Sequence, residues 1–320
     1  MSVTESYNVD STKVSVSGIS SGACMATQFH VAHSRNVMGV GMVAGGVGVV
    51  AGVPFMCSEG NALTATGVCM TTPNLIAVTP LEGITASAAF VGNIDSTSHM
   101  RNDKVWIFAG SHDSVVKPAA GHKVQQYYNH YVTSSNIKTV FNIPAEHCMP
   151  TKNYGGACDK LSTTNYLNNC NYDAAFELLN HIYGGNLKQP TTASGQLMQF
   201  DQGDFFHLSS PSTYSMDDIG YVYIPTGCQD KHTACKLHIA FHGCAQGQSK
   251  IGDAYVRHAG YNEAGEANNI IILYPQVIAR AVLANPQGCW DWWGYTGVLF
   301  ATKSGFQMTA VYRMMQKIMG

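Results

Sequence analysis

One short motif in the sequence could supply a nucleophile. The segment Gly18-Ile19-Ser20-Ser21-Gly22 matches the pattern GxSxG, in which a sharp strand-to-helix turn exposes the central serine. It is the only match in the chain, and it lies between a β-branched, strand-like segment, 13–17, and a helix-like segment, 23–31. The motif therefore predicts Ser20 as the nucleophile and the backbone N–H of Ser21 as an oxyanion donor. The alternative is an ordinary Ser/Gly-rich turn.

A serine hydroxyl becomes a good nucleophile only when a histidine removes its proton and a carboxylate orients that histidine. Asp113 follows a strand-like segment, 103–110, and His147 follows another, 137–143. Open α/β sheets place their sites at the carboxyl ends of strands. The chain order serine, acid, histidine therefore predicts that Asp113 and His147 complete a triad with Ser20.

Other interpretations of these residues stay open at this stage. Asp113 could be a turn or helix-capping aspartate, and His147 could be a histidine on a surface loop. Two residues of the same types lie close by but are less well placed. His112 precedes the turn at the strand end, and Asp103 stands at the wrong end of its strand.

The segments that would position this triad alternate between strand and helix, which indicates an α/β fold with a mostly parallel central sheet flanked by helices. Helices are expected at 117–131, 172–183, 253–267 and 307–319, and further strands at 195–200, 221–225, 236–241 and 269–274. No repeat of fixed period is present. We expect one catalytic domain, 1–320, with its weakest seam near residues 184–219, which begin with the polar linker 184–194.

An apolar strand, 236–241, ends in His242-Gly243, which is typical of the oxyanion turn in α/β-hydrolases. In those enzymes the turn precedes the nucleophile, but here it follows it. The segment 194–320 carries the strands that should come before residue 13, so we expect a circularly permuted α/β-hydrolase fold joined at 184–194. Under this arrangement the N–H of Cys244 is the second oxyanion donor. The alternative is two domains, but neither half would hold a complete sheet.

Composition narrows the classes of partner. Charged residues make up only 12% of the chain, and 18 Lys and Arg against 20 Asp and Glu give a net charge of −2. Nucleic-acid binding is not expected, because it needs a basic face. The stretch 37–55 is interrupted by glycines and a proline, so no membrane span is expected, and residues 1–10 do not resemble a signal peptide. A surface with few charges and almost no net charge suits an enzyme that acts on an uncharged substrate.

Ten cysteines are present without any CxxC pair, so a zinc ribbon is not predicted. Three pairs are close in turn-rich segments, which predicts the disulfides Cys57–Cys69, Cys158–Cys170 and Cys228–Cys235. Disulfides indicate an oxidising compartment, either the medium or the periplasm. The alternative is ten buried thiols in a cytosolic protein. No metal ion or cofactor is expected.

Three of the four tryptophans fall together at Trp290, Trp292 and Trp293. Aromatic rings offer large, rigid apolar surfaces that could bind an uncharged, hydrophobic substrate. They could instead all fill the core. We expect Trp290 to be internal, and Trp292 with Trp293 to lie at the cleft as substrate-binding residues.

The chain resembles the extracellular poly(3-hydroxybutyrate) depolymerases of the single-domain, circularly permuted type. The resemblance spans nearly the whole sequence, in the segments VSVSGISSGACMA (14–26), AGSHDSVV (109–116), PAEHCMP (144–150), LHIAFHGCAQ (237–246), NNIIILYPQ (268–276) and NPQGCWDWWG (285–294). It implies a triad of Ser20, Asp113 and His147, oxyanion donors at Ser21 and Cys244, a Cys244–Cys289 disulfide, and contact between Trp292 and a polyester chain. No separate substrate-binding domain is expected.

The chain departs from this family pattern at two cysteines and one segment. Cys24 and Cys148 are each expected near the cleft, where they form either a fifth disulfide or two buried thiols. The Gly/Val-rich run 45–53 has no counterpart that we can assign.

The sequence thus predicts a secreted, monomeric serine esterase that cleaves poly(3-hydroxybutyrate)-type polyesters through an acyl-enzyme. The alternative substrates are soluble or polysaccharide esters, such as feruloyl or acetyl groups. A third hypothesis is a non-catalytic surface-binding protein, although an intact triad argues against it.

Overall fold

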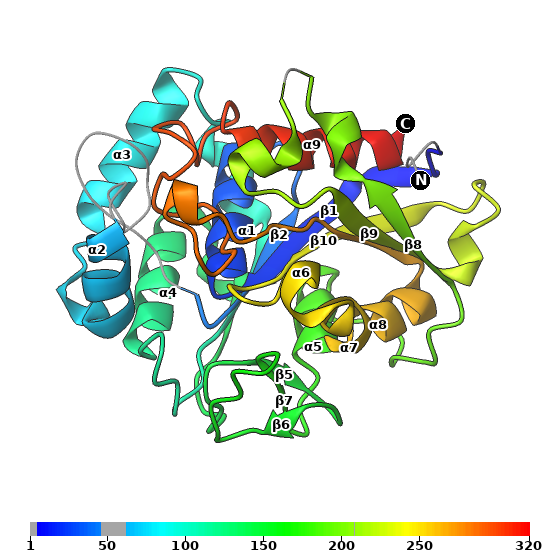
Figure 1. Cartoon of the computed structure of the whole chain (residues 1–320), viewed down its shortest axis with the longest axis horizontal. Helices are drawn as coiled ribbons and strands as arrows, with labels where there is room; N and C mark the ends of the chain where they lie inside the picture. Colours follow the sequence, from blue (N-terminus) through cyan, green and yellow to red (C-terminus); the bar gives the residue numbers. More distant parts are fainter. Residues whose placement is uncertain (1–4, 46–61, 208) are drawn as a thin grey trace.

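A computed structural model describes residues 5–45, 62–207 and 209–320. At its centre lies an eight-stranded sheet with the strand order β4-β3-β2-β1-β10-β11-β9-β8 (Figure 1). The strands are β1 (Val9–Ile19), β2 (Gly39–Val43), β3 (Lys104–Phe108), β4 (Ile137–Val140), β8 (Gln196–Asp201), β9 (Ile219–Ile224), β10 (Cys235–Phe241) and β11 (Ile270–Tyr274). A second, three-stranded sheet consists of β5 (Met149–Thr151), β7 (Leu167–Asn169) and β6 (Gly156–Ala157).

The large sheet is mostly parallel, which confirms the predicted fold class. Every neighbouring pair from β4 to β11 is parallel. At the other edge, β9 pairs antiparallel with β11, and β8 pairs antiparallel with β9. β1, from the start of the chain, pairs with β10, from its last third. The strand order is therefore that of an α/β-hydrolase sheet whose chain has been permuted.

The described ends of the chain lie together. The N–H of Tyr7 donates to the carbonyl of Ile318 at 2.8 Å, and the N and C labels of Figure 1 are close. Such proximity agrees with a circular permutation, because the new ends arise where one connection between neighbouring elements is opened.

Helices cover both faces of the sheet, and the sheet separates the core into two hydrophobic clusters. One cluster contains buried side chains of α1 (Ser21–Ala32), α4 (Ala119–Tyr131) and α9 (Phe306–Met319); the other contains those of α5 (Ala174–Ile182) and α8 (Tyr261–Asn268). Burial on both faces explains why β11 is a continuous apolar run rather than an alternating one. The remaining α-helices are α2 (Ala62–Thr64), α3 (Thr79–Phe90), α6 (Gln248–Ile251) and α7 (Ala254–His258).

Four features of the fold were missed or predicted incompletely. Strand β2 was not predicted, because the sequence GVGMV contains two glycines, yet all five residues are buried. Its glycines permit close contact: a Cβ on Gly41 would lie 3.1 Å from the side chain of Leu178. The helix expected at 253–267 is divided into α7 and α8 at Gly260, whose φ of 95° favours glycine. Helix α3 and the small sheet were also not predicted.

The nucleophile helix approaches the sheet unusually closely at Gly22. A Cβ placed on Gly22 would lie 2.3 Å from the carbonyl oxygen of His242 and 2.4 Å from that of Phe241. Both are backbone atoms of β10 and the turn after it, so they cannot move aside without displacing the sheet.

We predict that Gly22→Ala lowers the free energy of unfolding by about 1–3 kcal/mol or more, because the added methyl group overpacks a rigid contact. Gly83→Ala is the matched control: Gly83 is an exposed position inside α3 with no atom within 4 Å of an added Cβ. This control should gain about 0.5–1 kcal/mol from helix propensity. Urea denaturation of both variants measures the difference, and equal stabilities would contradict the proposed contact.

Candidate active site

Ser20 occupies a sharp turn between β1 and α1. Its backbone has φ 55° and ψ −121°, a conformation that a residue with a side chain adopts rarely and at a cost. The turn is held from both sides, since the Ser20 N–H donates to Val43 O at 2.9 Å and the Ser20 carbonyl accepts from Ala23 N–H at 3.0 Å. A Cβ on Gly18 would lie 2.2 Å from the carbonyl oxygen of Gly22. Both glycines of the GxSxG pattern therefore have a steric reason.

Asp113 and His147 meet beyond the carboxyl ends of β3 and β4. Asp113 Oδ2 accepts a hydrogen bond from His147 Nδ1 at 2.9 Å, and both side chains are buried. Asp113 Oδ1 accepts the N–H groups of Val115 and Val116, at 2.9 and 2.8 Å, which fixes the carboxylate in its loop. This arrangement leaves the other ring nitrogen, Nε2, available as a base.

Ser20 and His147 line the same cavity, whose volume is about 410 Å³. Within the described residues no hydrogen bond joins the Ser20 hydroxyl to His147; such bonds often tighten only when substrate is bound. The cavity is mainly apolar, and no Asp, Glu, Lys or Arg is among the described residues that line it. Such walls suit an uncharged, hydrophobic substrate.

The predicted oxyanion donors lie on two sides of Ser20. Ser21 is the first residue of α1, and Cys244 follows the His242-Gly243 turn. Neither backbone N–H has an acceptor among the described residues. A Cβ on Gly243 would lie 3.3 Å from Ser20 Cβ, so the turn carrying Cys244 contacts the nucleophile directly.

Two buried side chains hold the oxyanion turn in place. Gln246 Oε1 accepts the Gly243 N–H at 2.7 Å, and its Nε2 donates to the carbonyl of Asn165 at 2.8 Å. His242 donates from Nδ1 to the Gly243 carbonyl at 2.7 Å and accepts the Val277 N–H at Nε2 at 3.2 Å. Burial lowers the pKa of His242 to about 4, so its ring is neutral and has a structural role.

The tryptophan-rich loop is tied to this turn by a disulfide between Cys244 and Cys289. Trp290 is fully buried, as expected, whereas Trp292 and Trp293 both line the cavity that contains Ser20. The carboxylate of Asp291 organises the loop by accepting backbone N–H groups from residues 293 to 296. The loop therefore presents two indole rings from a rigid support.

The structure contains two further predicted disulfides, Cys158–Cys170 and Cys228–Cys235. Cys57 and residues 46–53 of the Gly/Val-rich run lie outside the described residues, so the Cys57–Cys69 pairing stays a prediction. The hypothesis of a Cys24–Cys148 disulfide was wrong: both side chains are buried, but they are not joined. They belong to the two hydrophobic clusters on opposite faces of the sheet, which keeps them apart.

The residues we rejected have other partners or positions. Asp103 accepts a hydrogen bond from His30 at 3.0 Å, and His112 is exposed. Three residues that hold the site were not predicted, namely Glu146, Gln246 and Asp291. Each acts by accepting backbone N–H groups from a loop, which is a contact that sequence spacing does not reveal.

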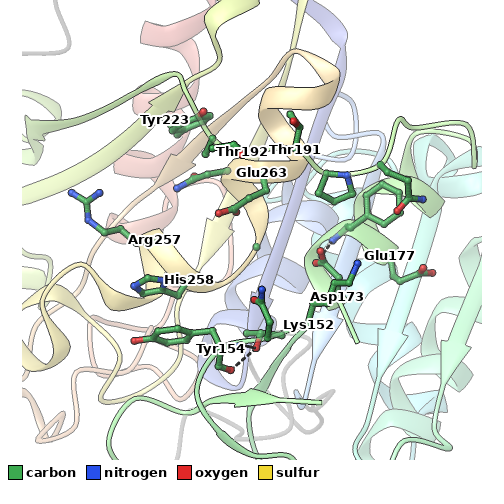
Figure 2. A pocket seen from close by; sticks show the side chains of 18 of the residues that line it. Lys152, Tyr154, Asp173, Glu177, Thr191, Thr192, Tyr223, Arg257, His258 and Glu263 are labelled. Atoms are coloured by element: carbon green, nitrogen blue, oxygen red, sulfur yellow. Dashed lines mark hydrogen bonds between the residues drawn. The ribbon is translucent and has the colours of Figure 1, made fainter. Parts of the chain in front are cut away.

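A larger cavity of about 1550 Å³ lies elsewhere, between the small sheet, α7 and α8 (Figure 2). Its lining is polar and includes no serine or cysteine. Its one histidine, His258, stacks on Tyr154 with ring centroids 3.9 Å apart. The smaller cavity is therefore the candidate active site, because it alone of the two contains the nucleophile and base.

No family model matches the chain, but individual proteins do. It is 39% identical over 313 residues to a poly(3-hydroxybutyrate) depolymerase of Delftia acidovorans, covering 97% of this chain and 60% of that protein's length. It is 36% identical over 326 residues to a polyhydroxybutyrate depolymerase of Talaromyces funiculosus, covering 98% of this chain and 91% of that protein.

The chain belongs to the polyhydroxybutyrate depolymerase family. Solved structures of polyhydroxybutyrate depolymerases agree with this assignment. One, a serine-to-alanine variant complexed with an R3HB trimer, is 33% identical with a TM-score of 0.89, covering 99% of this chain and 98% of that one. Another, from Penicillium funiculosum, is 32% identical with a TM-score of 0.85 and the same coverage.

No helix in the described ranges is both long and apolar enough to cross a membrane. The same residues contain no group of three or more His, Cys, Asp or Glu side chains placed to hold a metal ion.

We predict that a fluorophosphonate probe labels Ser20 and that His147→Ala slows labelling by about 10²–10⁴-fold, the usual contribution of a general base. His112→Ala is the matched control and should label at the wild-type rate, because the His112 side chain is exposed and takes no part in the Asp113–His147 hydrogen bond. Gel fluorescence against time measures both rates. A His147→Ala variant that labels normally would remove His147 from the site.

Proposed function

We propose that the chain is a secreted serine esterase that hydrolyses poly(3-hydroxybutyrate)-type polyesters to oligomers or monomer. The observation that carries the proposal is the meeting of Ser20, His147 and the Cys244 turn in one apolar cavity whose described lining residues include no Asp, Glu, Lys or Arg. Membership of the depolymerase family supports the same substrate class.

In the proposed reaction, Ser20 Oγ attacks the ester carbonyl while His147 Nε2 takes the hydroxyl proton. Asp113 Oδ2, 2.9 Å from His147 Nδ1, holds the ring and stabilises its positive charge. The N–H groups of Ser21 and Cys244 stabilise the oxyanion, each contributing about 3 kcal/mol to transition-state stabilisation.

Collapse of the oxyanion breaks the ester bond, and His147 returns the proton to the departing alkoxide, which leaves as the hydroxyl end of the polymer. Water then attacks the acyl-Ser20 ester with His147 again acting as the base. The acid is released and the Ser20 hydroxyl is restored. All proton transfers are accounted for by these residues and water.

Exposed apolar side chains on two segments that also line the cavity favour a polymer over a soluble sugar ester. Leu63 is 82% exposed and lies two residues before Ala65, which lines the cavity. On another segment, Val282 is 83% exposed and lies two residues before Ala284, which also lines it. A solid polyester offers a surface that such side chains can contact, whereas a sugar ester would favour polar groups at the rim.

We also infer a single catalytic domain over 1–320 whose permutation junction lies near 184–194. Support comes from the large sheet, to which segments on both sides of the junction contribute strands. Secretion into the medium or periplasm is supported by the disulfides, which persist in oxidising compartments. A monomer is the simplest state for such a domain.

We predict that the wild-type protein clears a turbid suspension of amorphous poly(3-hydroxybutyrate) and that Ser20→Ala lowers the rate by at least about 10⁴-fold. Turbidity against time measures this. If neither protein clears the suspension but the wild type cleaves p-nitrophenyl butyrate, the polymer assignment is wrong and a soluble ester becomes the substrate. A wild type that cleaves neither would revive the binding-protein hypothesis.

We predict that Trp292→Ala lowers polymer hydrolysis about tenfold or more, and p-nitrophenyl butyrate hydrolysis much less. Trp292 lines the cavity beside Ser20, and losing an aromatic contact costs a long apolar substrate more than a short one. The ratio of the two rates within the same variant corrects for any loss of folded protein. Equal losses on both substrates would argue against a polymer-binding role.

A further inference from the structure

The acid and the base of the proposed triad lie on different loops, which must be held together. The backbones of these loops run side by side: the N–H of Ser111 donates to Ile143 O at 2.9 Å, and that of His112 donates to Ala145 O at 3.2 Å. A Cβ on Gly110 would lie 2.2 Å from the Ala145 carbonyl oxygen. These contacts end just before Asp113 on one loop and His147 on the other.

A single buried carboxylate continues the connection between the loops. Glu146 Oε1 accepts the N–H of Ser114, the residue after Asp113, at 2.6 Å. The same oxygen accepts the N–H of His147 at 2.9 Å. One atom therefore fixes the backbone next to the acid and the backbone of the base.

The backbone of Glu146 is anchored as well as its side chain. Its backbone N–H donates to the carbonyl of Cys158 at 2.8 Å, and Cys158 is in a disulfide with Cys170. The side chain is 9% exposed, so water competes little for the carboxylate oxygens. Glu146 thus joins the two triad loops to a cross-linked segment beside the small sheet.

We propose that Glu146 is a positioning residue that sets the Asp113–His147 geometry through its contacts with both loops. This inference rests on the proposed function, because it assigns Glu146 a purpose within that triad. Glu146 is not among the residues that line the cavity containing Ser20, and its effect is transmitted through the backbone.

The electrostatics are consistent with an ionised Glu146. Burial alone would raise its pKa, but the donors from Ser114 and His147 outweigh burial and leave the pKa below its usual value. Hydrogen bonds from N–H groups to a carboxylate are stronger than neutral ones. A glutamine would retain an acceptor oxygen at the same place, whereas an alanine would leave the N–H of Ser114 and the buried N–H of His147 without one.

The test compares Glu146→Ala with Glu146→Gln on p-nitrophenyl butyrate, a soluble ester that avoids any dependence on polymer binding. Glu146→Ala should lower kcat about 10–100-fold with KM within about twofold, because a displacement of the base on the order of 1 Å costs that much. Glu146→Gln should restore kcat to within about fivefold of the wild type. Glu266→Ala is the matched control, since Glu266 accepts the Thr226 N–H and the Tyr223 hydroxyl away from the triad.

The inference is overturned if Glu146→Ala keeps wild-type kcat, or if Glu266→Ala loses as much kcat as Glu146→Ala. If Glu146→Ala does not fold, Glu146→Gln decides: kcat within about fivefold and unchanged KM support the acceptor role, and a larger loss of kcat overturns it. Ser20→Ala is measured alongside. If it stays active, the proposed function itself fails, which is a different result from a silent Glu146→Ala.

Discussion

The site depends on one pairing between strands from opposite ends of the chain. β1 runs parallel to β10 with Gly18 opposite Phe241, and both strands end at the same edge of the sheet. This register places the candidate nucleophile Ser20 against Gly243, and it brings the segments of the predicted oxyanion donors, Ser21 and Cys244, together. Neither segment alone could form the site. The pairing also explains why glycine is needed at Gly22, where α1 rests on the backbone leading into the oxyanion turn.

The loops around this pairing are stabilised by one recurring device. In each loop a buried side-chain oxygen accepts backbone N–H groups that have no partner in a helix or sheet. Gln246 does this for the oxyanion turn, Asp291 for the tryptophan loop and Glu146 for the triad loops. Buried polar backbone must be satisfied, and a side-chain acceptor does so while fixing the loop in one conformation. These contacts fix the loops of the site, although the loops belong to neither a helix nor the sheet.

Sequence reasoning succeeded where the chemistry is local and failed where it depends on contacts between distant segments. The turn at Ser20 could be predicted because GxSxG, the preceding strand and the following helix are contiguous. Glu146 could not, because a glutamate beside a histidine does not reveal which other loop its side chain reaches. Strand β2 was missed because its glycines weaken the strand pattern, although Gly39 leaves room for Ile182 and Gly41 for Leu178. The division between α7 and α8 was signalled by Gly260, but only its backbone conformation made the interruption certain.

Cys148 shows how the environment separates a nucleophile from a neighbour of similar chemistry. A thiol directly after the base could in principle compete with Ser20, since thiolates are strong nucleophiles. Burial raises the pKa of Cys148 far above its usual value, and the negative charges of Asp113 and Glu146 raise it further. The thiol therefore stays protonated and packs as a small apolar group, away from the cavity that contains Ser20. Burial, reinforced by the carboxylates of Asp113 and Glu146, thus keeps this thiol unreactive, and Ser20 stays the candidate nucleophile beside His147.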